Sequence, residues 1–344
     1  MLRSSKRREK PLVVYRRYVL KKDVQEAIRW KRIEAAAGKV HVDDVLAPLG
    51  WLSKRAWTRL LNLEKDRRGA PRKHLVFIGI ANVADYWWCA ARAVMESREG
   101  ELAFFRAYLE DRLRYSMELG CLARLPKRQK DWLEIGEELT LRDLQPLLNR
   151  RQERARHAFV EIPSMERDGV VYINPALLPD QREEVLNMAR ERGLQIGEDP
   201  VLEGKMMHTT HCGRGHFASL RWNFPWQHYV VVGVPDGLTD DFVCEYKTTG
   251  RAFLLWYIKP VAFAQTDIYG YFFRRTRKRV HVLVRESSQV KEFDELVDSK
   301  NAVRTLRSFG RADGGAPPKS PVAWKCKRCD WAKRCPLKTG RPWK

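Results

Sequence analysis

The sequence predicts an α/β fold in which a mixed central sheet is flanked by helices, with large helical additions. Three segments rich in β-branched residues are the clearest strands: YVVVGVPDGL (229–238), DFVCEYKTT (241–249) and RVHVLVRE (279–286). PDG and TDD supply turn residues in and after the first strand. The long aromatic segment 253–274 is predicted as a helix, and residues 101–158 are mostly helical in pattern. Strands interleaved with helices are typical of this fold class.

The chain divides into a basic extension and a larger domain. Residues 1–74 are predicted as a basic helical N-terminal extension, with Ser53 as a helix N-cap and KDRRGAPRKH as a linker. Residues 75–344 are predicted as one domain. It contains a helical insertion at about 100–200 and a tail at 321–344.

Further elements of this domain can be read from local patterns. We expect an apolar segment at 75–80, helices at 82–98, 180–193 and 205–211, a hairpin at 160–175, and a Gly/Pro linker at 310–321.

Composition and charge restrict the class of protein. The 344 residues carry a net charge of +22, of which residues 1–75 hold +13 and residues 321–344 hold +7. Concentrated positive charge and many aromatic residues indicate a nucleic-acid partner; solvated basic faces are the alternative. No apolar run is long enough to cross a membrane, and the basic N-terminus has no apolar core like that of a secretory signal. We therefore expect no membrane partner and a cytoplasmic location. There, seven cysteines are expected as metal ligands or buried thiols.

Two carboxylates and a lysine form a candidate metal and catalytic site. Glu245 and Lys247 are two residues apart on a strand, so their side chains share one face. Asp236 ends the preceding strand and would approach Glu245 if the two strands pair. Adjacent carboxylates attract Mg²⁺ or Mn²⁺, which activates water for attack on a phosphodiester. A solvated hairpin with a cross-strand Asp–Lys pair is the alternative.

The C-terminal tail carries three closely spaced cysteines, Cys326, Cys329 and Cys335. Three thiolates at this spacing can bind one metal centre, and a fourth ligand must come from elsewhere in the chain. Cys89 is the best fourth ligand on pattern grounds, and Cys212 is its rival. The spacing does not distinguish zinc from an iron–sulfur cluster.

A second metal site is possible in HTTHCGRGH, where His208, His211 and Cys212 would share a helical face near His216. Cys121 and Cys244 are expected to be core thiols.

Five motifs in order resemble a known nuclease family. His208, GVPDG, CEYK and QTDIY follow the order of the RecB-type branch of the PD-(D/E)XK nucleases. IANVADYWWCAARAVM and the cysteine tail resemble the first-cysteine helix and the final cysteine triplet of the CRISPR-associated Cas-four exonucleases. AddB and the nuclease domain of the Dna-two helicase share this arrangement. The resemblance covers roughly residues 75–95 and 200–340.

The resemblance implies a restriction-endonuclease-like core and a role for each matched residue. His208, Asp236 and Glu245, with the backbone carbonyl of Tyr246, would bind Mg²⁺ or Mn²⁺. Lys247 would be the catalytic lysine. Gln265 and Tyr269 lie four apart on one helix face; they would support the catalytic site and position DNA. The set implied to bind a 4Fe–4S cluster comprises Cys89, Cys326, Cys329 and Cys335.

The function implied is that of a metal-dependent DNA exonuclease acting on single-stranded or duplex ends, with a structural 4Fe–4S cluster. Possible protein partners are CRISPR integrase or helicase subunits. One alternative is a non-catalytic nucleic-acid-binding subunit of a DNA-processing or CRISPR adaptation complex. Another is a zinc-bearing DNA-binding regulator that uses the N-terminal helices.

Overall fold

The computed structural model describes residues 49–50, 52–67, 75–119, 140–158, 161–214, 219–287, 289–327 and 329–343. Most of the predicted N-terminal extension, and the predictions for Cys121 and His216, lie outside these residues. The chain forms two compact units. The first comprises residues 1–78, 100–147 and 222–232, and the second comprises residues 79–99, 148–221 and 233–344. The prediction of one domain from residue 75 to 344 stays a prediction.

The first unit contains a three-stranded sheet with the order β1-β6-β5. Its elements are α3 (Lys54–Arg67), β1 (Val76–Gly79), the later part of α5 (Tyr86–Glu118), the start of α6 (Leu141–Ala158), β5 (Trp222–Trp226) and β6 (Tyr229–Gly233). Trp57, Phe77, Phe105 and Tyr108 are buried in its core. Ser53 accepts a hydrogen bond from the Ala56 amide, which confirms it as the N-cap of α3.

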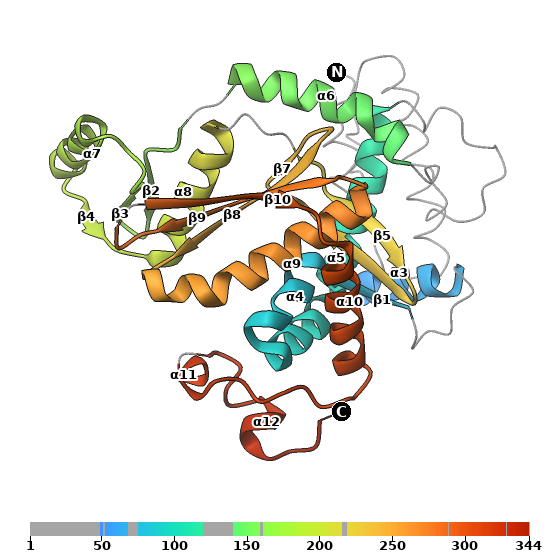
Figure 1. Cartoon of the computed structure of the whole chain (residues 1–344). Coiled ribbons are helices and arrows are strands. Elements are labelled where there is room, and N and C mark those ends of the chain that lie inside the picture. Colours follow the sequence, from blue (N-terminus) through green and yellow to red (C-terminus); the bar gives the residue numbers. More distant parts are fainter. Residues whose placement is uncertain are drawn as a thin grey trace, which may run out of the picture. The chain divides into compact units, whose positions relative to one another are not determined.

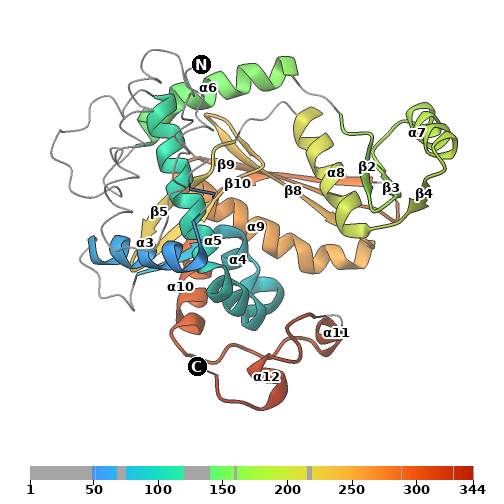
Figure 2. The same cartoon turned by 180° about the vertical axis from the view of Figure 1, so that it is seen from behind.

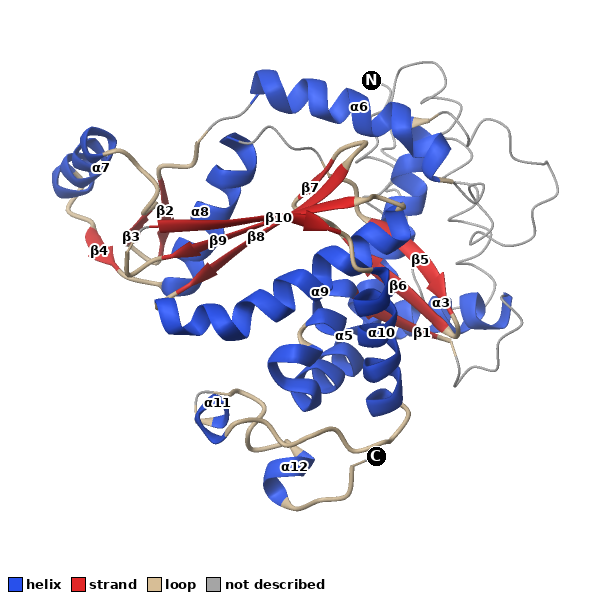
Figure 3. Ribbon diagram, viewed as in Figure 1, coloured by secondary structure: helices blue, strands red, loops and turns tan. Residues whose placement is uncertain are grey.

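The second unit is built on a four-stranded mixed sheet with the order β10-β9-β8-β7. These strands are β7 (Gly237–Leu238), β8 (Phe242–Thr249), β9 (Arg277–Val284) and β10 (Gln289–Leu296). β8 and β9 run parallel, whereas β7–β8 and β9–β10 are antiparallel. The predicted strands at 241–249 and 279–286 are therefore confirmed, and the sheet is mixed as expected (Figure 3).

Helices cover both faces of this sheet. α9 (Leu255–Phe273) connects the parallel strands β8 and β9, as a crossover helix must, and packs against both. α8 (Pro200–Arg214) packs on β8 from the other face (Figure 1). Adjacent residues of β8 identify the two faces. Lys247 bonds a side chain of α9, whereas the preceding residue, Tyr246, points to the opposite face and stacks on a side chain of α8.

A buried ion pair connects α9, β9 and α10 (Ser299–Asp313). The ammonium of Lys278 lies 2.7 Å from a carboxylate oxygen of Asp267, and both side chains are almost fully buried. The same carboxylate accepts hydrogen bonds from the Asp298 amide and the Asn301 side chain at the start of α10. The Asp267 carboxylate therefore has hydrogen-bond donors on both oxygens, as a buried carboxylate requires.

A smaller subdomain precedes α8. β2 (Ser164–Arg167) and β3 (Val170–Ile173) form the predicted antiparallel hairpin, and β4 (Gln195–Gly197) adds a parallel strand. α7 (Pro179–Glu191) packs on this sheet through Val185 and Ala189. Helix α4 (Ile80–Ala84) packs on α9, and the tail forms α11 (Ala323–Cys326) and α12 (Pro336–Thr339) after the end of α10 (Figure 2). Among the described residues, no helix has both the length and the apolar character needed to cross a bilayer.

Candidate functional site

Asp236 lies at the connection between the two sheets. The sequence left open whether strands 229–238 and 241–249 pair. The structure divides the first segment: β6 belongs to the sheet β1-β6-β5. Pro235 has no amide hydrogen to donate, which favours an end to the strand there. The two-residue strand β7 then pairs with β8, with Gly237 opposite Cys244. Asp236 is the residue immediately before β7, and from this position its side chain reaches β8.

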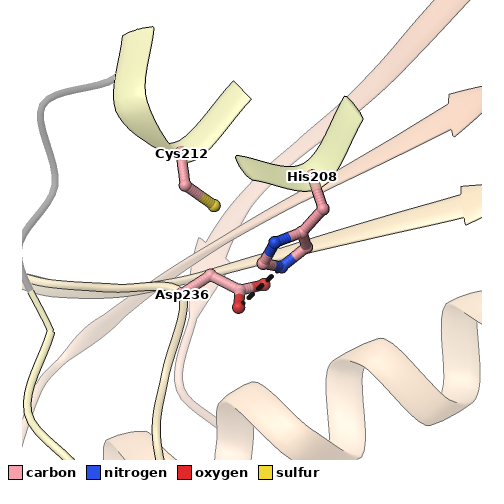
Figure 4. A group of neighbouring side chains, drawn as sticks. All are labelled: His208, Cys212 and Asp236. Carbon is pink, nitrogen blue, oxygen red and sulfur yellow. Dashed lines mark ion pairs between the residues drawn. The ribbon is translucent and has the colours of Figure 1, made fainter. Parts of the chain in front are cut away.

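Both carboxylate oxygens of Asp236 are bonded. Oδ1 lies 2.8 Å from Nε2 of His208 on α8, and Oδ2 accepts a hydrogen bond of 2.7 Å from the Tyr246 amide on β8. The Asp236 side chain is mostly buried, but the imidazole of His208 is partly exposed. This pair joins α8, β7 and β8 at one point, as Figure 4 shows for the two side chains.

Glu245 and Lys247 lie on the face of β8 that is covered by α9. The Lys247 ammonium donates to Oε1 of Glu245 at 2.6 Å and to the side-chain oxygen of Gln265 at 2.9 Å. The spacing of two residues on a strand therefore brings these charges together, as expected. The structure thus gathers His208, Asp236, Glu245, Lys247 and Gln265.

The charges of this cluster perturb both of its buried titratable groups. Burial, and then the negative charge of Asp236, raise the pKa of Glu245 to about 8. Burial alone would lower the pKa of Lys247, but the charges of Glu245 and Asp236 outweigh it and raise that pKa. Two carboxylates compete for one ammonium, so additional positive charge would be stabilising here.

The donor set fits a divalent cation. Oε2 of Glu245 is buried and no donor among the described residues is bonded to it. Such an orphaned carboxylate oxygen is costly unless a ligand completes it. An imidazole nitrogen and two carboxylates are suitable ligands for Mn²⁺, and the carboxylates for Mg²⁺. The Tyr246 amide donates to Asp236, and the metal contact of the Tyr246 carbonyl stays a prediction.

Tyr269 supports the site from below the surface. Its hydroxyl donates to the carbonyl of Val234 at 2.7 Å, two residues before Asp236, and its ring is fully buried. A methyl group added at Gly233 would lie 2.9 Å from atoms of this ring, so the glycine permits the close approach. Tyr269 therefore fixes the chain that carries Asp236; direct contact with DNA would require an exposed ring.

The cluster faces an open pocket of about 820 Å³. Its wall includes His208, Asp236, Glu245, Lys247 and Gln265, with Lys205 and Arg285 at its edges. Arg285 lies 3.3 Å from Glu203. The site is thus accessible to a ligand, and cations border it.

Two further residues lie near the site: Asp85, which the sequence did not indicate, and Cys212, which the sequence allowed as a metal ligand beside His208. Asp85, which ends α4, is half-buried, and burial raises the pKa of its carboxyl while the charge of Lys247 opposes that rise. Cys212 lies one helical turn after His208, and its sulfur, the imidazole and the Asp236 carboxylate lie within 4.8 Å of one another (Figure 4). The sequence signal for Cys212 was its spacing of four residues from His208 on a helix. No sequence pattern indicated that Asp85 would lie near this site.

His211 is not part of this group, although the sequence allowed it. Its Nε2 lies 2.6 Å from Nδ1 of His281, and its ring stacks on Tyr246 with centroids 4.0 Å apart. Cys244 is buried, as expected for a core thiol.

The cysteine tail lies against the start of α5. Lys325 donates to the carbonyl of Trp88, and its ammonium lies 4.2 Å from the centre of the Trp88 ring and 4.5 Å from that of Tyr257. Trp331 donates to Glu96, and Arg334 pairs with Glu99. These contacts bring the tail next to Cys89.

The four predicted cluster ligands are neighbours without forming a tight group. Cys89 interrupts the helical dihedrals of α5, with φ −158° and ψ 103°. Burial raises its pKa, and the charges of Cys329, Cys335 and Cys326 add to the rise. Within the described part of the chain, however, no three of these sulfurs lie within 4.8 Å of one another; the group that meets this distance is His208, Cys212 and Asp236.

Comparison with known proteins does not identify the chain. No family model and no curated protein matches it. Among solved structures, one described as "Crystal structure of SSO0001" aligns over 56% of this chain and 96% of its own length, with 17% identity and a TM-score of 0.32. That score is too low to support an argument about fold or function.

Proposed function

We propose that the chain is a metal-dependent DNA exonuclease with a PD-(D/E)XK active site, acting on single-stranded ends. One observation carries the proposal: the Lys247 ammonium bonds both Glu245 and Gln265, beside an Asp236–His208 pair, at the wall of an open pocket. A lysine, two carboxylates and an imidazole around an orphaned carboxylate oxygen form the donor set that phosphodiester hydrolysis requires.

His208, Asp236 and Glu245 would hold a divalent ion, Mg²⁺ or Mn²⁺. When bound, such an ion neutralises charge on the phosphate and lowers the pKa of water. Lys247 lies next to this position and keeps its positive charge, because the neighbouring carboxylates raise its pKa. Its ammonium can hold the attacking water or stabilise negative charge on the phosphate as it develops.

Gln265 and Tyr269 preorganise these groups. The Gln265 oxygen accepts from Lys247, which restricts the ammonium to the direction of the pocket. Tyr269 holds the chain two residues before Asp236. A catalytic group that is fixed before the substrate arrives loses less free energy to reorganisation in the transition state.

A polyanionic substrate matches the charge of the protein. Lys205 and Arg285 border the pocket, and the chain carries a net charge of +22. DNA gains affinity from such a surface by releasing counterions. We therefore expect cleavage to weaken with increasing salt.

The cysteines would hold a structural 4Fe–4S cluster between α5 and the tail. A single zinc ion with Zn–S bonds of about 2.3 Å places its sulfurs roughly 3.8 Å apart. No three of the described cysteine sulfurs are that close, although their charges act on Cys89. A cluster in which each thiolate binds a different iron accepts a wider arrangement, and the resemblance of the cysteine pattern to the Cas-four exonucleases is the reason to propose iron–sulfur rather than zinc.

Digestion of end-labelled single-stranded DNA with Mn²⁺ tests the proposal. The wild-type protein should shorten the DNA from an end, and Lys247→Ala should lower the rate by at least about a hundredfold, since it removes a transition-state contact. Lys291→Ala, which removes an exposed lysine from β10, is the matched control and should cleave normally.

Equal digestion by Lys247→Ala and the wild type would refute the assigned site. A closed circular substrate in a parallel reaction separates exonuclease from endonuclease activity. The visible absorption of the purified protein tests the cluster separately: an iron–sulfur band that is lost in Cys89→Ser is expected, whereas a colourless, iron-free protein would exclude it.

A further inference from the structure

The metal site has a thiol that the proposed hydrolysis does not use. Cys212 and His208 lie one turn apart on α8, and Asp236 reaches them from the residue before β7 (Figure 4). Their ligand atoms, one sulfur, one imidazole nitrogen and one carboxylate oxygen, all lie within 4.8 Å of one another. Three different donor types thus converge from two elements.

We propose that His208, Cys212 and Asp236 form a binding site for Zn²⁺, in which the ion excludes the Mg²⁺ or Mn²⁺ of the active state. The inference shares two residues with the proposed catalytic site, but it does not depend on cleavage of DNA. A thiolate, an imidazole and a carboxylate are ligands that zinc accepts together.

The three ligand atoms could surround a tetrahedral ion after small shifts of their side chains. Zinc bonds of about 2.0–2.3 Å place neighbouring ligand atoms roughly 3.3–3.7 Å apart. The His208 and Asp236 atoms are already 2.8 Å apart, so the ion would separate these two and draw the sulfur toward them. The fourth position is open to water from the pocket, or to Oε2 of Glu245, which no described donor satisfies.

The thiol decides which metal is preferred. Mg²⁺ takes oxygen ligands and gains nothing from sulfur, whereas zinc binds thiolate strongly. Zinc binding removes one proton from Cys212, which passes to the buffer, and no other bond is broken. Because both ions need His208 and Asp236, they cannot be bound together at this point, so zinc would act as an inhibitor of a magnesium- or manganese-dependent reaction.

Cobalt(II), a spectroscopic substitute for zinc, tests the site directly. The full-length protein as purified is titrated with Co²⁺, and the spectrum before titration is subtracted. We expect a near-ultraviolet sulfur-to-cobalt charge-transfer band that saturates at one equivalent and disappears on addition of Zn²⁺. Cys212→Ser and His208→Ala should each lose this band.

Cys244→Ala is the matched control, because it removes a buried thiol on β8 outside the trio and should keep the band. A band that is unchanged in Cys212→Ser would overturn the inference, as would its absence from the wild type. Circular dichroism of each variant shows whether a lost band reflects unfolding, and Cys212→Ala provides a second substitution if serine disturbs the helix.

Inhibition provides an independent readout. If the wild type cleaves DNA with Mn²⁺, Cys212→Ser should require at least tenfold more Zn²⁺ for half-inhibition. Equal sensitivity to zinc would contradict the inference and leave the nuclease proposal standing. The reverse outcome is also informative. If the protein shows a cobalt band that depends on Cys212 but does not cleave DNA, the zinc site is present and the proposed function is wrong.

Discussion

Replacing Glu245 by glutamine should stabilise the protein in the absence of divalent ions, although it removes a metal ligand. The side chain is almost fully buried, and its pKa rises from 4.5 to about 8 through burial and the charge of Asp236. Between these two pH values the folded protein retains a proton that the unfolded chain has released. Stability therefore falls as pH rises through this window, by about 1.4 kcal/mol per pH unit.

The magnitude follows from the size of the window. At about pH 7 the cost reaches about 3 kcal/mol, as an upper bound. Glutamine keeps an oxygen that can accept the hydrogen bond of Lys247, which is now 2.6 Å from Oε1. Because the folded wild type mostly retains its Glu245 proton at about pH 7, the substitution removes little attraction between charges there. We expect a net gain of about 2 kcal/mol for Glu245→Gln, or roughly 3 °C in thermal midpoint for a chain of 344 residues.

Thermal unfolding in a chelating buffer at about pH 7 and about pH 5 measures this effect. The advantage of Glu245→Gln should shrink strongly at the lower pH, where the wild-type carboxyl is protonated in the folded protein. Saturating Mn²⁺ should reverse the order, because about 2.7 kcal/mol of binding free energy at a hundredfold excess over Kd stabilises the wild type. An advantage that is equal at both pH values, or a loss of stability at about pH 7, would refute the reasoning.

Three further substitutions test the supports of the site and the tail. Tyr269→Phe removes the hydrogen bond to Val234 and should cost about 1 kcal/mol in unfolding free energy, with slower DNA cleavage at normal folding; an unchanged cleavage rate would argue against this support. Gly233→Ala places a methyl group against the Tyr269 ring and should cost about 1–3 kcal/mol by denaturant unfolding; a neutral result would show that the ring moves freely. Lys325→Met removes the contact with the carbonyl and ring of Trp88 and should speed proteolysis of the tail after residue 321, whereas exposed Lys327→Met should not.

Local pattern was sufficient for the strand that carries Glu245 and Lys247. The two-residue spacing depends on the strand period alone, and the structure brings the two charges to 2.6 Å. The position of Asp236 required knowledge of how the chain leaves β6. The sequence left open whether segments 229–238 and 241–249 pair. In the structure β6 and β8 belong to different sheets, and within the first segment the short β7 is the part that pairs with β8.

Tertiary contacts decide between two residues that the sequence allowed equally. His211 and Cys212 follow each other on α8, and the helical period allows either to join His208. Packing against β8 and β9 directs His211 toward Tyr246 and His281, which leaves Cys212 beside Asp236. The partners of a helix are not contained in its own pattern, so this choice could not be predicted.

One short segment connects the carboxylate site with the cysteine tail. Asp85 ends α4, and its main-chain oxygen accepts a hydrogen bond from the Cys89 amide at 2.9 Å. The carboxyl group of the same half-buried residue is close enough to Lys247 that the lysine charge opposes the rise of its pKa. The next residue before Cys89, Trp88, receives Lys325 from the tail. The backbone that positions Cys89 thus also positions an acidic neighbour of Lys247, which gives the docked tail a physical connection to the candidate catalytic lysine through five consecutive residues.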